Sequence, residues 1–214
     1  MECRSQRTIG GILLLITMIG LYTGPAMAIE EPKFKLIEQM EDFELREYES
    51  YIVAEAFVEG EFDEVGNQGF RRLASYIFGQ NRKKESIDMT APVNLEPTSE
   101  KIAMTAPVNQ EAQDGKWRIT FTMPAKYSLD SLPEPLDDQI SLKQEPGRLM
   151  AAIRYSGGWS QELFEEKVAM LKSFMKERGI RAVGEPIFAR YNSPFSLWFL
   201  RRNEVLIPVD SPGN

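Results

Sequence analysis

The chain has no histidine and, among its 214 residues, a single cysteine, Cys3. The missing histidine excludes the Ser-His-Asp and Cys-His groups of nucleophilic enzymes and every zinc site that needs an imidazole. Catalysis would have to rest on carboxylates, lysine, tyrosine or serine, and no pattern in the sequence places a nucleophile beside a base. We therefore expect that the chain is not an enzyme. The alternative is a hydrolase that uses a glutamate base and a tyrosine.

Long apolar runs are also scarce, and the one present lies near the start of the chain. Ile9–Leu21 follows two arginines and precedes a Gly-Pro break and the small-x-small sequence of residues 26–28. This order is typical of a signal peptide, and the run is shorter than the roughly 20 apolar residues of a membrane-spanning helix. We predict a signal peptide over residues 1–28, one domain over residues 29–214, and a periplasmic or secreted location. An uncleaved anchor is the alternative, and membrane contact would then be confined to this segment.

Positive charge is in short supply. Lysine and arginine total 25 against 32 aspartates and glutamates, for a net charge of −7; residues 1–28 contribute +1, so residues 29–214 carry −8. An acidic chain of this kind argues against broad binding of nucleic acid, because affinity for the phosphate backbone depends on lysine and arginine. The remaining 186 residues are enough for one domain with a proper core, which must supply the stability without disulfides.

Two segments have the apolar spacing of helices. Phe70, Leu73, Ala74 and Ile77 recur at helical intervals, which predicts a helix from residue 63 or 64 to about residue 78. Ser160 is the expected N-cap of a second helix that ends near residue 178. Glycines 79 and 179 follow the two helices as plausible stops.

The other apolar segments alternate as strands do. Strands are predicted at 43–47, Tyr51–Val58, Trp117–Met123, Leu149–Tyr155, Pro186–Tyr191, Ser196–Leu200 and Val205–Pro208, whereas Ile29–Lys35 is predicted as a loose start and Pro124–Asp138 as a connector. The order strand–helix–strands therefore occurs twice, over about residues 43–123 and 140–208. We predict an α+β fold in which a pseudo-symmetric two-repeat antiparallel sheet or distorted barrel carries two long helices. A groove between the halves is the expected place for a small molecule.

The pentapeptide Met-Thr-Ala-Pro-Val occurs twice, at Met89–Val93 and at Met104–Val108. Because proline has no N–H and favours an extended residue before it, each copy is predicted to end an edge strand, Ile87–Pro92 and Lys101–Pro107. A local duplication that makes two similar strand ends explains the repeat equally well on physical grounds.

The doubled pentapeptide, with its flanks, resembles the SOUL haem-binding protein family. Similar segments are 87–93, 101–108, the early strand Phe43–Tyr48, the strand end 121–124, and 183–186 followed by 189–192 and Pro194. The resemblance covers about residues 34–209. It implies a two-repeat αβ barrel related to the gyrase-inhibitor-like small-molecule-binding domains, and binding of haem or another tetrapyrrole at an apolar surface beside the first helix.

Some members of this family have a histidine proposed as an axial ligand of the iron, and this chain has no position to which that role could be carried. Methionine and tyrosine are the remaining possible iron ligands, and no spacing supports either, so we predict no metal site. Binding would have to rely on apolar contacts and on basic residues that pair with the propionates.

The first helix and the basic segment after it supply the candidate site. The predicted ligand-binding residues are Arg71, Arg72, Leu73, Tyr76, Ile77, Phe78, Arg82 and Lys83. A guanidinium can bind a carboxylate such as a haem propionate through two parallel hydrogen bonds. Phe78 is out of phase with the apolar stripe and is expected to be exposed or to face the groove. The alternative is that the apolar residues bury against the sheet and that the basic residues, with Lys84, form a solvated face.

Two further groups of side chains are candidate walls of a pocket. Met89 and Met104 could line an adaptable apolar cavity. Phe195, Trp198 and Phe199 could form a second wall. For both groups, burial in the core is the preferred interpretation.

The leading functional hypothesis is an exported carrier that binds haem or a related porphyrin without changing it chemically. The alternative is a sensor or scavenger of other amphipathic small molecules, with Glu162 or Glu185 as a possible acid for a cationic ligand. A pocket lined by carboxylates and aromatic rings would favour this alternative. A role restricted to protein–protein interaction is a further possibility.

Overall fold

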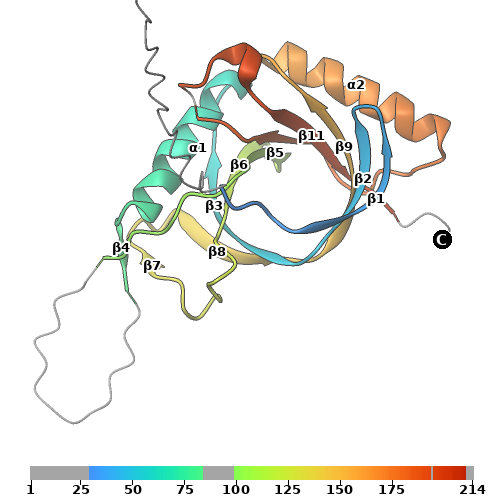
Figure 1. Ribbon diagram of the computed structural model, residues 1–214. Coiled ribbons are helices and arrows are strands. Elements are labelled where there is room, and N and C mark those ends of the chain that lie inside the picture. Colours follow the sequence, from blue (N-terminus) through green and yellow to red (C-terminus); the bar gives the residue numbers. More distant parts are fainter. Residues whose placement is uncertain (1–28, 84–98, 194, 211–214) are drawn as a thin grey trace, which may run out of the picture.

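Nine strands form one curled antiparallel sheet, and two helices pack against its outer side in the computed structural model (Figure 1). The structure describes residues 29–83, 99–193 and 195–210. The elements are β1 (Phe34–Met40), β2 (Phe43–Tyr48), β3 (Tyr51–Val58), α1 (Phe62–Ile77), β4 (Asn81–Arg82), β5 (Val108–Gln113), β6 (Lys116–Thr122), β7 (Glu134–Pro135), β8 (Ile140–Glu145), β9 (Arg148–Tyr155), α2 (Gln161–Glu177), β10 (Ile187–Arg190), the 3-10 helix η1 (Trp198–Leu200) and β11 (Asn203–Pro208). β4 and β7 pair separately as a two-stranded sheet.

The strand order shows two equivalent halves that meet where β5 pairs with β10. From this junction outward, one half runs β5-β6-β3-β8 and the other β10-β11-β9-β2, with β1 added at the far edge. β2 precedes β3 in the chain but pairs with β9, whereas β8 precedes β9 but pairs with β3. The two repeats therefore exchange their first strands. This arrangement confirms the predicted two-repeat α+β fold.

Both helices begin and end close to their predicted bounds. α1 starts with acidic residues Asp63 and Glu64 in its first turn, where negative charge is favourable. It stops before Gly79, whose φ of 118° suits glycine far better than any other residue. In α2 the Ser160 hydroxyl accepts a hydrogen bond from the backbone N–H of Leu163 at 3.4 Å, so the predicted N-cap is confirmed.

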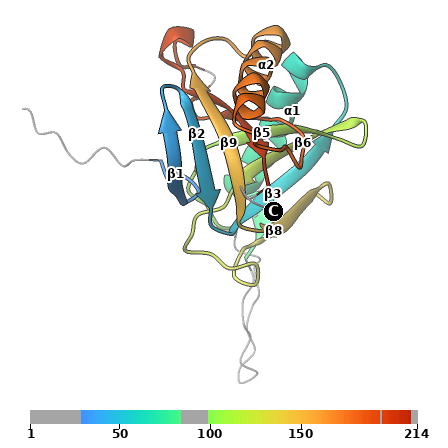
Figure 2. The same ribbon diagram turned by 90° about the vertical axis from the view of Figure 1, so that its right-hand side faces the viewer.

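The apolar core lies between the helices and the outer face of the sheet. Leu73 of α1 is fully buried in the same cluster as Ile119 of β6. α1 approaches so closely that a Cβ at Gly69 would lie 2.4 Å from the Ile119 side chain. Phe62, at the start of α1, belongs instead to the cluster under α2, where its ring centroid lies 5.1 Å from that of Phe164 and 5.6 Å from that of Phe188. The turned view in Figure 2 shows α1 and α2 together above the sheet.

Three strand predictions need correction or fall outside the described structure. Lys101–Pro107 is an irregular segment, and the strand begins only at Val108. Ser196–Leu200 contains the exposed 3-10 helix η1 in place of the predicted strand. Ile87–Pro92 lies outside the described residues. The sequence reasoning also missed β8 and treated the start of β1 as irregular. Among the described residues, no helix has the length and apolar character needed to span a membrane.

Candidate functional site

A cavity of about 570 Å³ lies between α1, the segment 104–108 that enters β5, and the end of β10 with residues 191–193 and 195 after it. We call it the α1 cavity. Its apolar lining residues are Ile29, Phe70, Phe78, Met104, Ala106, Val108 and Phe195. Its polar lining residues are Asn67, Arg71, Thr105, Arg190, Tyr191, Asn192 and Ser193. This size and this mixture, apolar walls with a few polar groups, are typical of small-molecule sites, which measure about 300–1,000 Å³.

Large apolar side chains are left open to solvent around the cavity. Phe78 is 58% exposed, Met104 41% and Phe195 96%, whereas Phe70 is half-buried with its ring centroid 5.4 Å from that of Phe121. Phe78 is exposed because it follows the last turn of α1 and lies out of phase with the buried stripe, as the sequence predicted. Exposed apolar groups that gather beside a cavity indicate a binding surface.

Arg190, the last residue of β10, brings a buried guanidinium to the α1 cavity. Its side chain is only 6% exposed and rests against α1 at Gly66, where a Cβ would lie 2.4 Å from Arg190 Nη2. The guanidinium carbon lies 5.0 Å from the ring centroid of Trp159 and 5.8 Å from that of Phe188. Within the described chain, Arg190 Nε and Nη2 have no hydrogen-bond partner. Burial lowers the pKa of Arg190 to about 10, so the group is still cationic at neutral pH.

The concave face of the sheet, in contrast, holds ionised pairs beside a small apolar cluster that includes Met150 and Leu206. Arg46 donates to both carboxylate oxygens of the fully buried Glu204, at 2.6 and 3.1 Å, and Tyr191 donates to the same carboxylate at 2.8 Å. Burial alone would raise the pKa of Glu204, but the bonds and charge of Arg46 outweigh it, and the pKa is lowered. Two openings on this face hold about 10 Å³ each, about one water. Each of these two openings is far too small for a tetrapyrrole.

Of the predicted ligand-binding residues, Arg71 and Phe78 line the α1 cavity. Leu73, Tyr76 and Ile77 lie in the core, where at most 1% of each side chain is exposed. These three residues therefore follow the alternative interpretation of the sequence, in which the apolar face of the helix packs against the sheet. The Tyr76 hydroxyl donates to the backbone carbonyl of residue 133 at 2.9 Å, which satisfies its polar atom inside the core.

The other predicted basic residues lie away from the α1 cavity. Arg72 is 3.4 Å from the carboxylate of Asp137, and Arg82 is 4.0 Å from that of Glu134. Lys83 is exposed. Surface ion pairs of this kind contribute little to stability. These three residues are therefore arranged as a solvated basic face.

Sequence reasoning did not select Arg190, and it gave the wrong preference for three aromatic residues. The sequence signals for Arg190 were its place in the family-like segment 189–192 and its position directly after three apolar strand residues. Phe195, Trp198 and Phe199 are 96%, 63% and 53% exposed, so the expectation that they lie in the core is wrong. Met104 lines the cavity, which was the less favoured of its two interpretations, and Met89 lies outside the described residues.

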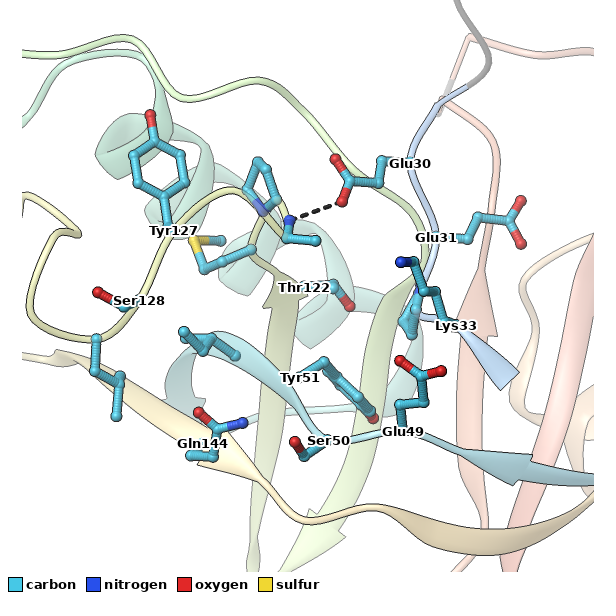
Figure 3. A pocket seen from close by; sticks show the side chains of 16 residues that line it. Glu30, Glu31, Lys33, Glu49, Ser50, Tyr51, Thr122, Tyr127, Ser128 and Gln144 are labelled. Carbon is cyan, nitrogen blue, oxygen red and sulfur yellow. Dashed lines mark hydrogen bonds between the residues drawn. The ribbon is translucent and has the colours of Figure 1, made fainter. Parts of the chain in front are cut away.

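Figure 3 shows a second cavity, of about 390 Å³, between the segment 30–33, the start of β3 and the loop after β6. Glutamates 30, 31 and 49 line it together with Lys33, Tyr51 and Tyr127. The Glu30 carboxylate accepts a hydrogen bond from the backbone N–H of residue 125 at 2.7 Å, drawn as a dashed line. Glu162 and Glu185 line neither cavity. In the described parts of the chain, no cluster of three or more acidic or cysteine side chains is placed to hold a metal ion.

The curled antiparallel sheet, the exchanged repeats and the two outer helices define a two-repeat α+β fold with cavities of small-molecule size. The chain belongs to the SOUL heme-binding protein family, whose model matches residues 29–208. Heme-binding protein 2 of Homo sapiens is 28% identical over 195 residues, which cover 84% of this chain and 89% of that protein. Heme-binding protein 1 of Xenopus laevis is 24% identical over 187 residues, or 82% of this chain and 94% of that protein.

Solved structures with very different sequences share the architecture. A hydrolase from Listeria innocua has a TM-score of 0.54 at 12% identity and covers 81% of this chain and 94% of its own. The C-terminal domain of EcmrR has a TM-score of 0.53 at 10% identity and covers 79% of this chain and 97% of its own. At such low identity these similarities establish the fold alone.

Proposed function

We propose that this chain binds haem or a related tetrapyrrole in the α1 cavity, without a histidine ligand and without changing the ligand chemically. The observation that carries the proposal is the cavity itself: in a chain of the SOUL heme-binding protein family, an apolar space beside α1 joins exposed Phe78 and Met104 to Arg71 and Arg190. The cavity thus combines an apolar lining with cationic groups.

A porphyrin fits this lining for simple physical reasons. Its flat apolar ring gains free energy by leaving water and by contacting aromatic side chains such as Phe78 and Phe70. Met104 is flexible and polarisable, so it can adapt to the edge of a ring system. The carboxylates at one side of the ring are matched by arginine. Because the binding depends on contact and charge, it should tolerate removal of the iron.

The test is a titration of the purified chain with haem and with metal-free protoporphyrin IX, followed by the Soret absorbance and by tryptophan fluorescence. We expect saturable binding of both at micromolar concentration, with affinities of the same order of magnitude. Phe78→Ser should weaken both, because Phe78 is exposed in the cavity. Tyr76→Phe is the matched control, because Tyr76 belongs to the same helix but is buried in the apolar core. This variant should bind both ligands as the wild type does. Absence of a saturable signal, or equal binding by Phe78→Ser, would contradict the proposal.

A second candidate function is supported by the cavity of Figure 3, which is lined by carboxylates and tyrosines. A sensor or scavenger of amphipathic cations would use such a lining, because a cation is attracted both by glutamate and by an aromatic face. Ethidium, a planar aromatic cation, is a direct probe. Saturable fluorescence enhancement that is lost in Glu49→Gln would favour this function. If ethidium does not bind, this second function is wrong, and the tetrapyrrole proposal is unaffected.

We also propose that residues 1–28 direct export and are removed. The support is the basic start, the apolar run and the small-x-small end of that segment. Ile29 lines the α1 cavity, so cleavage after residue 28 would add a cationic α-amino group there. Cell fractionation and N-terminal sequencing test the proposal: a periplasmic or secreted chain that begins at Ile29 is expected. A cytoplasmic chain that keeps residues 1–28 would contradict it.

A further inference from the structure

The unpaired N–H donors of Arg190 indicate which chemical group of the ligand lies against them. We propose that Arg190 binds a carboxylate of the bound tetrapyrrole at the buried wall of the α1 cavity, so that the site selects free acids over their esters. This inference rests on the proposed function and makes it more specific.

Arg190 differs from the other arginines that the sheet buries or half-buries. Arg46, Arg118 and Arg202 each lie within hydrogen-bond distance of a carboxylate, at 2.6, 2.6 and 2.9 Å. In the part of the chain that the structure describes, Arg190 forms no ion pair, although only 6% of it is exposed. A buried charge without a counterion is costly, and folded proteins rarely leave buried donors unsatisfied. A ligand whose anionic group pairs with Arg190 would remove this unfavourable free energy on binding.

The two unpaired donors have the geometry that a carboxylate requires. Both atoms are buried from solvent in the ligand-free chain, so a carboxylate reaches them only when the surrounding wall of the cavity shifts. Nε–H and the neighbouring N–H of Nη2 point in the same direction in the guanidinium plane, so they match the two oxygens of one carboxylate. Both atoms are the ones without a partner in the described chain. A single hydroxyl or carbonyl oxygen could not satisfy both donors equally well. Lysine could not reproduce the pair, because its ammonium lacks this planar fork.

The surroundings of Arg190 fix its side chain. Trp159 and Phe188 lie beside the guanidinium, and Gly66 of α1 leaves the space that it fills. None of these neighbours supplies a negative charge. The cavity that Arg190 lines also has apolar walls, with Phe70 and Val108 among them. A ligand with an apolar body and a carboxylate at one edge therefore complements this cavity.

The test compares haem with haem dimethyl ester, which keeps the ring and the iron and removes the negative charges. Wild type should bind the free acid about tenfold or more tightly than the ester, as is typical of hydrogen bonds between charged groups. Arg190→Gln should reduce the affinity for haem to about that for the ester and leave ester binding unchanged. Arg71→Gln is the matched control: Arg71 lines the same cavity but is exposed, so its removal should have a clearly smaller effect. Arg190→Lys should restore only part of the preference.

The outcomes separate the two proposals. If haem and its ester bind wild type equally, or if Arg190→Gln weakens both equally, the carboxylate inference is overturned while tetrapyrrole binding stands. If neither compound binds, both proposals fail. Chemical unfolding of each variant shows that it is folded. A loss of the acid-over-ester preference in a folded Arg190→Gln chain, with retained ester binding, supports the inference.

Discussion

Replacing Arg190 by methionine should stabilise the ligand-free protein. The substitution keeps a long apolar side chain between β10 and α1 and removes the buried charge. For most buried ion-pair partners the opposite result is expected, because removing one partner leaves the other uncompensated. In the described structure Arg190 has no such partner, so its removal leaves no uncompensated charge. Stability and ligand binding should therefore change in opposite directions.

The magnitude follows from the burial of the guanidinium. Burial lowers the pKa of Arg190 from its usual value to about 10. This shift corresponds to about 3 kcal/mol of unfavourable free energy that the folded state bears while the group is charged. Methionine loses the cation–π contact with Trp159 and some packing at Gly66, together about 2 kcal/mol. We therefore expect the free energy of unfolding to rise by about 1 kcal/mol.

Urea unfolding at equilibrium, followed by tryptophan fluorescence, measures the difference between Arg190→Met and wild type. Below pH 10 both folded and unfolded wild type hold the proton of Arg190, so the advantage of the variant should be constant. As the pH rises above 10, the folded wild type releases this proton before the unfolded chain does, so wild type gains stability and the advantage should shrink. A variant that is less stable by 1 kcal/mol or more at pH 7 would refute the reasoning and assign Arg190 a structural role.

Two further substitutions test contacts around the sheet. Glu204→Gln leaves Arg46 buried without its charge partner and should cost about 3–5 kcal/mol in urea unfolding at pH 7. Since the pKa of Glu204 is lowered in the folded state, wild type should lose this advantage as the pH falls below the ordinary glutamate value, and an unchanged acid dependence in the variant would contradict the assignment. Gly66→Ala should destabilise wild type by about 1–3 kcal/mol, because its Cβ would collide with Arg190. The cost should be smaller in the Arg190→Met background, and additive effects in this double-mutant cycle would contradict the close contact.

Periodic patterns allowed the sequence to predict most of the fold. α1 and its buried stripe follow from apolar spacing, and Ser160 marks the start of α2 because the N-cap interaction is local. Lys101–Pro107 was predicted as a strand, yet its backbone forms hydrogen bonds with distant segments. The N–H of Ile102 donates to the carbonyl of Ile77 at 2.8 Å, and the N–H of Ala106 donates to the carbonyl of residue 30 at 2.9 Å. Such tertiary bonds leave no periodic signal.

The site was harder to predict than the fold, for two physical reasons. The apolar run 195–200 has the composition of a buried strand, and composition cannot distinguish an exposed apolar surface from a core. Arg190 is unusual only because β10, α1 and the segment around Trp159 meet there. The burial of Arg190, and the lack of a carboxylate beside it in the described chain, depend on three elements that are distant in sequence. The exposure of Phe78, which depends on the phase of one helix, was predicted correctly.

The position of β11 has a consequence for how the protein is made. β11 comes after every other strand in the chain, yet it lies inside the sheet between β9 and β10. Its Glu204 neutralises Arg46, 158 residues earlier. A nascent chain without β11 therefore leaves β9 and β10 with open edges and Arg46 without its main counterion. We therefore expect that the sheet cannot close before β11 is available, and that a chain lacking β11 exposes strand edges that favour aggregation.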